Sequence, residues 1–279
     1  MDAPLVRAYL DSLPDRPPDE RSVERVRTCL ASLQGPDVRY LVATLIGPGA
    51  PGVARVAAAV LRSAGARTAT LGATVDRTQV DRDVIDDALL AKAGTMAAAS
   101  GYQLAATSPE LGELSRREAT VILALTAFAD SSQRVALLLD PASERNDPVH
   151  APRPDLLVVA SGAWAYAERA LDLVAGGTPL VMAVPEETAR ERALARIAEL
   201  GVPALVGGRD YAIRAQGGEV ELLVRDEPYV RFEPPALVDH DELATGIATA
   251  LALGALGIRM REEWILAGMD ELRGAPVHS

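Results

Sequence analysis

Residues 39–60 read Arg-Tyr-Leu-Val-Ala-Thr-Leu-Ile, then Gly47-Pro48-Gly49-Ala50-Pro51-Gly52, then Val-Ala-Arg-Val-Ala-Ala-Ala-Val. The continuous apolar run at 39–46 is typical of a strand that is buried on both faces of a parallel sheet. A strongly helical segment at 53–64 follows the glycine-rich turn, and a short strand is expected at 68–71. Strand, turn, helix and strand in this order indicate a βαβ unit.

The same alternation extends along most of the chain. Residues 211–232 differ, because short alternating segments around Gly217-Gly218 predict an antiparallel hairpin or meander. We therefore predict an α/β fold with a mainly parallel, Rossmann-like sheet and helices on both faces. In this prediction residues 1–36 are a helical extension and residues 37–279 form one α/β domain. Further strands are expected at 135–140, 155–160, 179–184 and 204–207, and helices at 3–13, 20–33, 82–98, 115–132, 163–175, 186–200, 239–256 and 260–271.

The composition restricts the partners of the protein. The chain has 279 residues and a formal net charge of −11, which argues against binding to nucleic acid or to an anionic membrane surface. No basic segment followed by an apolar run marks a signal peptide at the start, and no apolar stretch reaches a membrane-spanning length, so we expect a cytoplasmic protein. Cys29 is the single cysteine and is predicted to be a core residue.

The turn at 47–52 lies where a parallel sheet can bind an anion. Backbone N–H groups and the dipole of the following helix would face such a ligand. Pro48 and Pro51 remove two of the donors, however, and the lysine and the Ser/Thr of a phosphate-binding loop are absent. Lys92 is the only lysine of the chain and lies in no such context. Two interpretations stay open, a weak anion site and a tight turn without a ligand.

Several segments together resemble one known family. They include Tyr9-Leu-Asp-Ser-Leu-Pro14, Leu30-Ala-Ser-Leu-Gln-Gly-Pro36, Val135-Ala-Leu-Leu-Leu-Asp140 and Glu199-Leu-Gly-Val-Pro203. With the 39–65 unit, their order and spacing resemble the ATP-binding central domain of the folylpolyglutamate synthetase / Mur ligase family, from about residue 8 to 270. The resemblance implies a P-loop NTPase-like sheet and a relationship to ATP-dependent amide-bond ligation.

The chain departs from this family where the family's chemistry is done. By the resemblance, the P-loop lysine falls on Ala50 and the magnesium-binding serine on Gly52. The magnesium-binding glutamate falls on Leu139, and the lysine that the family carbamylates falls on Ala170. The family's S-P-H-L segment falls near residues 73–76 without its serine or histidine. Phosphoryl transfer depends on positioning and charge neutralisation, so these losses remove its main requirements.

A few positions retain residues of the family's site. Arg145 and Asp147 keep an arginine and an aspartate of its G-G-R-L-D segment, and they form either a salt bridge within their loop or a surviving ligand contact. His240 keeps a histidine near the last helices, where it is either a solvated helix-start residue or a remnant of the site. The candidate remnant site therefore comprises Gly47, Gly49, Ala50, Gly52, Arg145, Asp147 and His240.

These observations predict a catalytically degenerate homologue of an ATP-dependent amide ligase. We expect a non-catalytic binding, regulatory or partner subunit, without catalytic residues, a metal site or a cofactor, and with ATP/Mg binding at most weak. The expected partner is a second copy of the chain or a ligase of the same family. Two alternatives stay open: a ligase whose site is completed in trans by another chain, since the resemblance includes no C-terminal ligase domain, and a binder of an anionic small molecule at the 47–52 turn.

Overall fold

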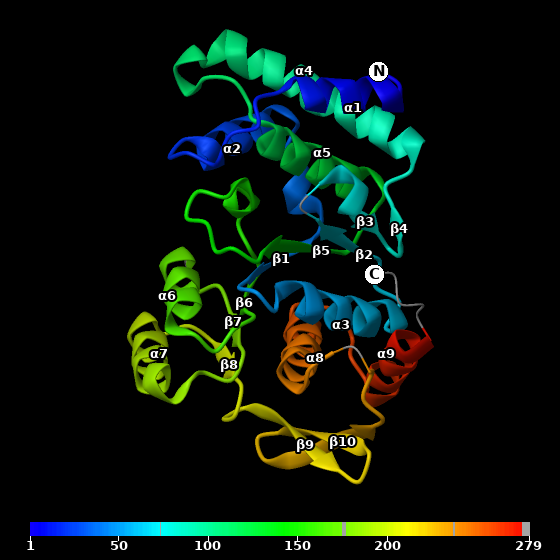
Figure 1. The fold of residues 1–279 in the computed structure, drawn as a ribbon, viewed down its shortest axis with the longest axis vertical. Coiled ribbons are helices and arrows are strands. Elements are labelled where there is room, and N and C mark those ends of the chain that lie inside the picture. Colours follow the sequence, from blue (N-terminus) through cyan, green and yellow to red (C-terminus); the bar gives the residue numbers. More distant parts are fainter. Residues whose placement is uncertain (73, 175–176, 237, 275–279) are drawn as a thin grey trace. The chain divides into compact units, whose positions relative to one another are not determined.

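The computed structural model describes residues 1–72, 74–174, 177–236 and 238–274 (Figure 1). Residue contacts divide the chain into two compact units, which we describe separately. Unit 1 comprises residues 1–44, 67–139 and 144–154, and unit 2 comprises residues 45–66, 140–143 and 155–279. Strand β1 (Leu41–Ile46) contributes residues to both units.

Unit 1 contains one part of the eight-stranded sheet and the helices beside it. Its strands follow the order β4-β3-β2-β5-β1, in which β2 pairs with β5 in parallel and β3 pairs with both of its neighbours antiparallel. Helices α1 and α2 pack against α4 and α5. The elements are α1 (Ala3–Ser12), α2 (Ser22–Ser32), β2 (Thr68–Leu71), β3 (Gln79–Val80), β4 (Asp83–Val84), α4 (Asp87–Thr107), α5 (Arg116–Asp130) and β5 (Val135–Asp140), with short 3₁₀ turns at Pro36–Arg39, Val75–Arg77, Pro109–Leu111 and Pro148–His150.

A buried ion pair joins two helices of unit 1. Arg25 of α2 and Glu118 of α5 have side chains that are only 2% and 1% exposed. The Arg25 guanidinium donates to both carboxylate oxygens of Glu118, with Nη2 2.6 Å from Oε1 and Nε 3.0 Å from Oε2. Glu118 also accepts from the backbone N–H of Ser115 at 2.8 Å, which closes a capping box at the start of α5. The pair thereby fixes α2 to the capped end of α5.

Unit 2 contains the second part of the parallel sheet and a separate small sheet. Across the sheet, β1 is followed by β6, β7 and β8. Strand β7 is parallel to both β6 and β8. Strands β9, β10 and β11 form an antiparallel meander, as predicted for residues 211–232. The elements are α3 (Ala50–Ser63), β6 (Leu156–Val159), α6 (Trp164–Leu173), β7 (Leu180–Met182), α7 (Glu187–Leu200), β8 (Ala204–Val206), β9 (Tyr211–Gln216), β10 (Glu219–Val224), β11 (Glu227–Phe232), α8 (His240–Ala255) and α9 (Glu262–Gly274).

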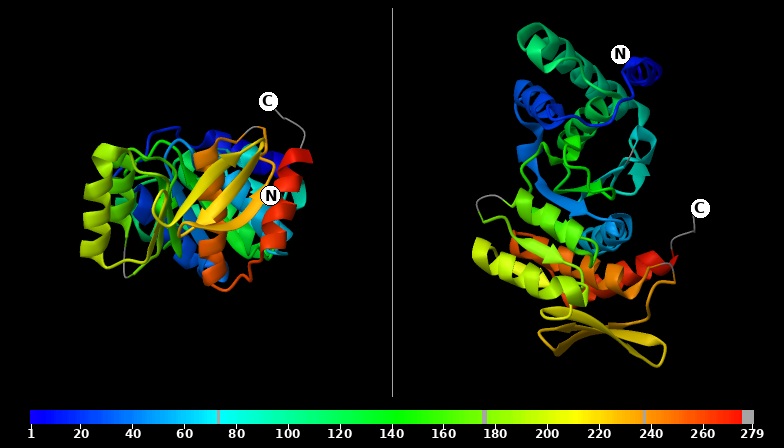
Figure 2. Two further views of the ribbon diagram at one scale, coloured as in Figure 1. Left: turned by 90° about the horizontal axis from the view of Figure 1, so that it is seen from below. Right: turned by 60° about the vertical axis from the view of Figure 1, so that its left-hand side comes forward.

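Helices cover both faces of the unit 2 strands. Leu157 and Val159 of β6 point to a core that is completed by α6 and α7. The other face meets α8, which contacts β6 and β7 and packs against α3. The small sheet contacts α8 through β9 and α9 through β11 (Figure 2). The predicted fold class, a mainly parallel α/β sheet with helices on both faces, is therefore confirmed. Within the described ranges, no helix has the length and apolar character needed to cross a membrane.

Several helix boundaries differ from the sequence prediction, and those of α4 and α3 have a local explanation. The helix predicted at 82–98 lies at Asp87–Thr107, because Asp86 is its N-cap and accepts from the Leu89 N–H at 2.8 Å. Residues 79–84 form short antiparallel strands instead. Helix α3 begins at Ala50 rather than at residue 53, because Pro51 occupies its first turn, where a missing N–H costs nothing. Residue 175, the predicted end of another helix, lies outside the described residues.

Candidate functional site

The turn between β1 and α3 uses its hydrogen-bond donors internally. Two prolines leave four N–H groups among residues 47–52. Gly52 carries one of these four groups, and no hydrogen bond is formed by it within the described residues. The other three are donated to carbonyl oxygens of unit 2: Gly47 to Asp140 at 3.0 Å, Gly49 to Ala160 at 3.1 Å and Ala50 to Gly47 at 3.0 Å. A phosphate-binding loop needs several N–H groups that face the ligand, and this turn offers at most one.

The glycines of the turn have packing reasons. A Cβ atom on Gly49 would lie 2.6 Å from the carbonyl oxygen of Ala160, which is a backbone atom and has little freedom to move. Gly47 has a φ of +109°, and a Cβ atom there would lie 3.1 Å from the Cβ of Ser161. The turn is therefore pressed against the residues that follow β6. Close approach of two backbone segments explains the glycines without a bound phosphate.

Ala50 and Gly52 stand where the resemblance places a lysine and a serine. Ala50 is fully buried as the first residue of α3. A lysine at this position would have to carry its charge out of the protein core. Gly52 is closely approached by Glu242 of α8: a Cβ atom on Gly52 would lie 2.0 Å from the Glu242 Oε2. Neither position has room for the family's side chain in the observed arrangement.

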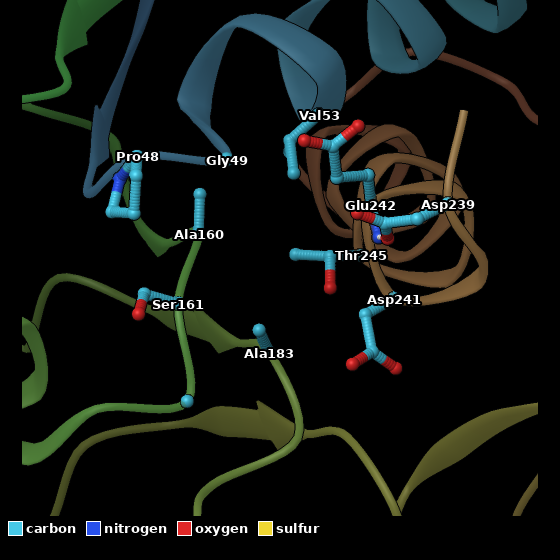
Figure 3. Close-up of a pocket in the computed structure, with 11 residues that line it drawn as sticks. Pro48, Gly49, Val53, Ala160, Ser161, Ala183, Asp239, Asp241, Glu242 and Thr245 are labelled. Carbon is cyan, nitrogen blue, oxygen red and sulfur yellow. Dashed lines mark hydrogen bonds between the residues drawn. The ribbon is translucent and has the colours of Figure 1, made fainter. Parts of the chain in front are cut away.

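A pocket of about 340 Å³ adjoins the turn and is acidic. Its walls come from the turn, from the residues after β6 and from the first turn of α8, where Asp239, Asp241 and Glu242 supply three carboxylates (Figure 3). Thr245 lines the pocket too, and its Oγ1 lies 3.3 Å from the hydroxyl of the buried Tyr211. No lysine or arginine lines this pocket in the described part of the chain. Its charge opposes a phosphate ligand.

Glu242 lies closest to the turn among these acids. Figure 3 shows its carboxylate beside Val53 at the start of α3, whereas the Asp241 carboxylate points away from α3. Burial raises the pKa of the Glu242 carboxyl above its ordinary value, the negative charge of Asp239 raises it further, and the positive charge of Arg55 opposes both. A half-buried acid therefore occupies the space in front of the α3 turn.

The sequence analysis missed Glu242. The segment Asp239-His-Asp-Glu242 matches the pattern of a capping box, in which the glutamate side chain returns to the N–H of the N-cap residue. Asp239 is the N-cap and accepts from the Glu242 N–H at 2.7 Å. The Glu242 side chain instead lies against Gly52. Local sequence favours the capping box, so only the tertiary contact between α3 and α8 reveals the position of this carboxylate.

The remaining predicted site residues have separate positions. Asp147 of unit 1 pairs with Arg117 at 3.4 Å, and it accepts from the Val149 N–H at 2.9 Å. Arg145 lies in the same segment of unit 1, near the start of residues 144–154. His240 is the exposed first residue of α8 in unit 2. Ala73, on which the first residue of the family's S-P-H-L segment falls, lies outside the described residues.

Other reactive side chains do not gather at the turn. The Nζ of Lys92 lies 3.2 Å from the carboxylate of Asp130 in unit 1. Within the described ranges, no three His, Cys, Asp or Glu side chains are grouped so that they could hold a metal ion. Cys29 is 1% exposed in the core of unit 1, as predicted.

We expect Cys29 to react slowly with thiol reagents. Burial raises the pKa of its thiol from 9.0 to about 11, and a hydrogen bond with Ser100 partly opposes that rise. Two pKa units reduce the thiolate on the order of 100-fold at pH 8, and the thiolate is the nucleophile. Native protein should therefore react with an aromatic disulfide reagent at least on the order of 100-fold more slowly than urea-unfolded protein. Equal rates would contradict this burial.

The same shift gives a pH dependence of stability. Because the pKa of Cys29 is higher in the folded state, the folded protein binds this proton more tightly. The stabilisation that this tighter proton binding gives the folded state is complete below pH 9 and is lost as the pH rises to about 11. The urea midpoint should fall over this range, and the variant Cys29→Ala should lose the thiol-dependent part of the fall. An identical fall in the variant would assign the effect to other groups.

The arrangement defines an α/β fold that solved folylpolyglutamate synthetases share. Solved structures with this fold include the apo form of folylpolyglutamate synthetase from Lactobacillus casei, with a TM-score of 0.83 and 18% identity over 98% of this chain and 72% of that chain. The folylpolyglutamate synthase from Mycobacterium tuberculosis, solved with ADP and AMPPCP, gives a TM-score of 0.78 and 18% identity over 99% of this chain and 66% of that chain. The fold expected from the resemblance is therefore confirmed. No family model and no curated protein sequence matches the chain.

Proposed function

We propose that this protein is a non-catalytic relative of the folylpolyglutamate synthetase type of amide ligase, which acts as a binding, regulatory or partner subunit. The fold similarity supports the relationship to ATP-dependent ligases. The main support for a non-catalytic role comes from the hydrogen bonds and contacts of the turn that precedes and begins α3. Three of its N–H groups are used within the protein, and the Glu242 carboxylate lies against the glycine that carries the fourth.

Electrostatics support the same proposal. A protein that binds a nucleoside triphosphate needs lysine, arginine or Mg²⁺ to neutralise the charge of the phosphates. Here the corresponding pocket contains Asp239, Asp241 and Glu242, and Ala50 is fully buried at the position of the family's lysine. A phosphate group in this pocket would meet carboxylates at short range, and the described residues that line the pocket include no lysine or arginine.

Calorimetric titration with Mg-ATP tests the proposal. We expect no saturable binding in the micromolar range and no Mg²⁺-dependent hydrolysis, because the turn lacks free donors and the pocket is negative. The Mycobacterium tuberculosis folylpolyglutamate synthase, which has been solved with ADP and AMPPCP, is the positive control under the same conditions. Micromolar Mg²⁺-dependent binding together with ATP hydrolysis by this protein would contradict the proposal.

The two alternatives gain less support. An anionic small molecule at the 47–52 turn would find at most the Gly52 N–H, and Glu242 lies in front of it. A ligase completed in trans would need residual ligand contacts, yet the Asp147 carboxylate is engaged by Arg117 and by the Val149 N–H. The binding or partner role is therefore the function that we carry forward.

A further inference from the structure

The Glu242 carboxylate fills a space that a larger residue at position 52 would need. A Cβ atom on Gly52 would lie 2.0 Å from Oε2, 2.3 Å from Cδ and 2.7 Å from Oε1 of Glu242. All three distances are too short for ordinary contacts. Gly52 and the observed position of Glu242 therefore depend on each other: any side chain at 52 displaces the carboxylate.

Positive charge faces the Glu242 carboxylate on the side of α3, whereas burial and the negative charge of Asp239 disfavour its charged form. It lies at the first turn of α3, a 14-residue helix, and it belongs to the first turn of α8, a 16-residue helix. Helix N-termini carry partial positive charge and stabilise nearby anions. Arg55 adds a full positive charge near Glu242 on the side of α3, while Asp239 opposes it. A carboxylate here occupies the place that an external anion would take at the N-terminus of α3.

We propose that Glu242 is a built-in anion of the α3 turn, which occupies the space in front of Gly52 and excludes external phosphate groups from it. The capping pattern strengthens this assignment. Glu118 closes the capping box of α5, whereas Glu242 has the matching position in α8 and lies against Gly52 instead. The inference rests on the proposed function, because it explains how the same turn is kept from nucleotides.

A double-mutant cycle tests the occupancy. In the background Glu242→Ala, the substitution Gly52→Ala should raise Tm by about 2 °C, because alanine favours a helix over glycine. With Glu242 present, the new methyl group must expel the carboxylate, so this rise should be lost. The matched control is Asp241→Ala, which removes one negative charge from the same helical turn but leaves Glu242 in place. Gly52→Ala should behave in this control as it does with the natural residues. Equal effects in all three backgrounds would overturn the proposal.

Inorganic phosphate tests the exclusion. Millimolar phosphate, compared with chloride at equal ionic strength, should raise Tm of the Glu242→Ala variant and should leave the unmodified protein and Asp241→Ala unchanged. The double-mutant cycle could show coupling between positions 52 and 242 while phosphate fails to stabilise Glu242→Ala. That result would overturn the proposal that Glu242 excludes phosphate and would leave only a packing contact. If the unmodified protein bound Mg-ATP and the double-mutant cycle still showed coupling between positions 52 and 242, only the proposed function would be contradicted. ATP would then bind without using this turn.

Discussion

Replacing Arg25 with leucine is expected to lower the free energy of unfolding by about 3–5 kcal/mol. The substitution leaves the Glu118 carboxylate, which is 1% exposed, without its guanidinium partner in the core of unit 1. It also removes the hydrogen bond from Arg25 to the carbonyl of Leu111 at 2.9 Å and the ion pair to Asp19 at 2.7 Å. An uncompensated buried charge is more costly than a lost surface pair, because solvent does not screen it.

Urea denaturation followed by circular dichroism measures this loss. The second variant, Arg25→Leu with Glu118→Gln, should recover part of it, since the buried carboxylate is replaced by a neutral amide. The matched control is Arg196→Leu, which breaks an ion pair with Glu199 in which the two side chains are 46% and 65% exposed. Arg196→Leu should lower the free energy of unfolding by at most about 1 kcal/mol. Similar losses for Arg25→Leu and Arg196→Leu would show that the buried pair has no special weight.

Replacing Gly49 with alanine is expected to destabilise the protein by about 1–3 kcal/mol without any ligand present. The added methyl group would lie 2.6 Å from the carbonyl oxygen of Ala160, so one of the two backbone segments must move. That movement would strain the hydrogen bond from the Gly49 N–H to the same oxygen. The prediction separates a packing role for this glycine from a ligand role, because a glycine kept for phosphate alone would tolerate alanine in the free protein.

The matched control for Gly49→Ala is Gly274→Ala at the end of α9. Apart from its chain neighbours and the backbone of its own helix, no atom of the described residues lies within 4 Å of a Cβ built on Gly274, and its φ lies outside the left-handed region. This control should change the free energy of unfolding by no more than about 0.5 kcal/mol. Thermal or urea unfolding of both variants in nucleotide-free buffer provides the measurement. A neutral Gly49→Ala variant would refute the packing explanation.

The sequence predicts the parallel sheet well because the signals for it are local. The apolar run before Gly47 becomes β1, and the helix that follows it packs as expected. Residues 211–232 become the predicted meander, since the Gly217-Gly218 turn and the alternating pattern act over a few residues. Each of these elements can be derived from neighbours in the chain.

Segment 79–86 could not be predicted in the same way. Its strands β3 and β4 have two residues each, which is too short for a periodic pattern. Asp81 and Asp86 look alike in sequence, as acids near a helix start. In the structure Asp81 pairs with Arg67 at 3.1 Å, and Asp86 caps α4. Only the tertiary partner decides which acid begins the helix.

Only the local part of the candidate site's arrangement follows from the sequence. Gly47, Gly49, Ala50 and Gly52 do form one turn at the start of α3, because the chain itself connects them. The contacts of Glu242 with Gly52 and of Arg117 with Asp147 join residues that are far apart in sequence. No local pattern encodes such pairs, so a single sequence could not reveal them.

The two prolines of the turn limit how far a single substitution could make it resemble a phosphate-binding loop. A single restored lysine at Ala50 would enter a fully buried position. It would also face a backbone in which Pro48 and Pro51 have no amide hydrogen to offer. A lysine at position 50 alone would add a buried charge and no backbone donor, so it would not by itself rebuild a phosphate-binding loop. A turn built in this way would respond to a single substitution through packing and stability before it responded through ligand binding.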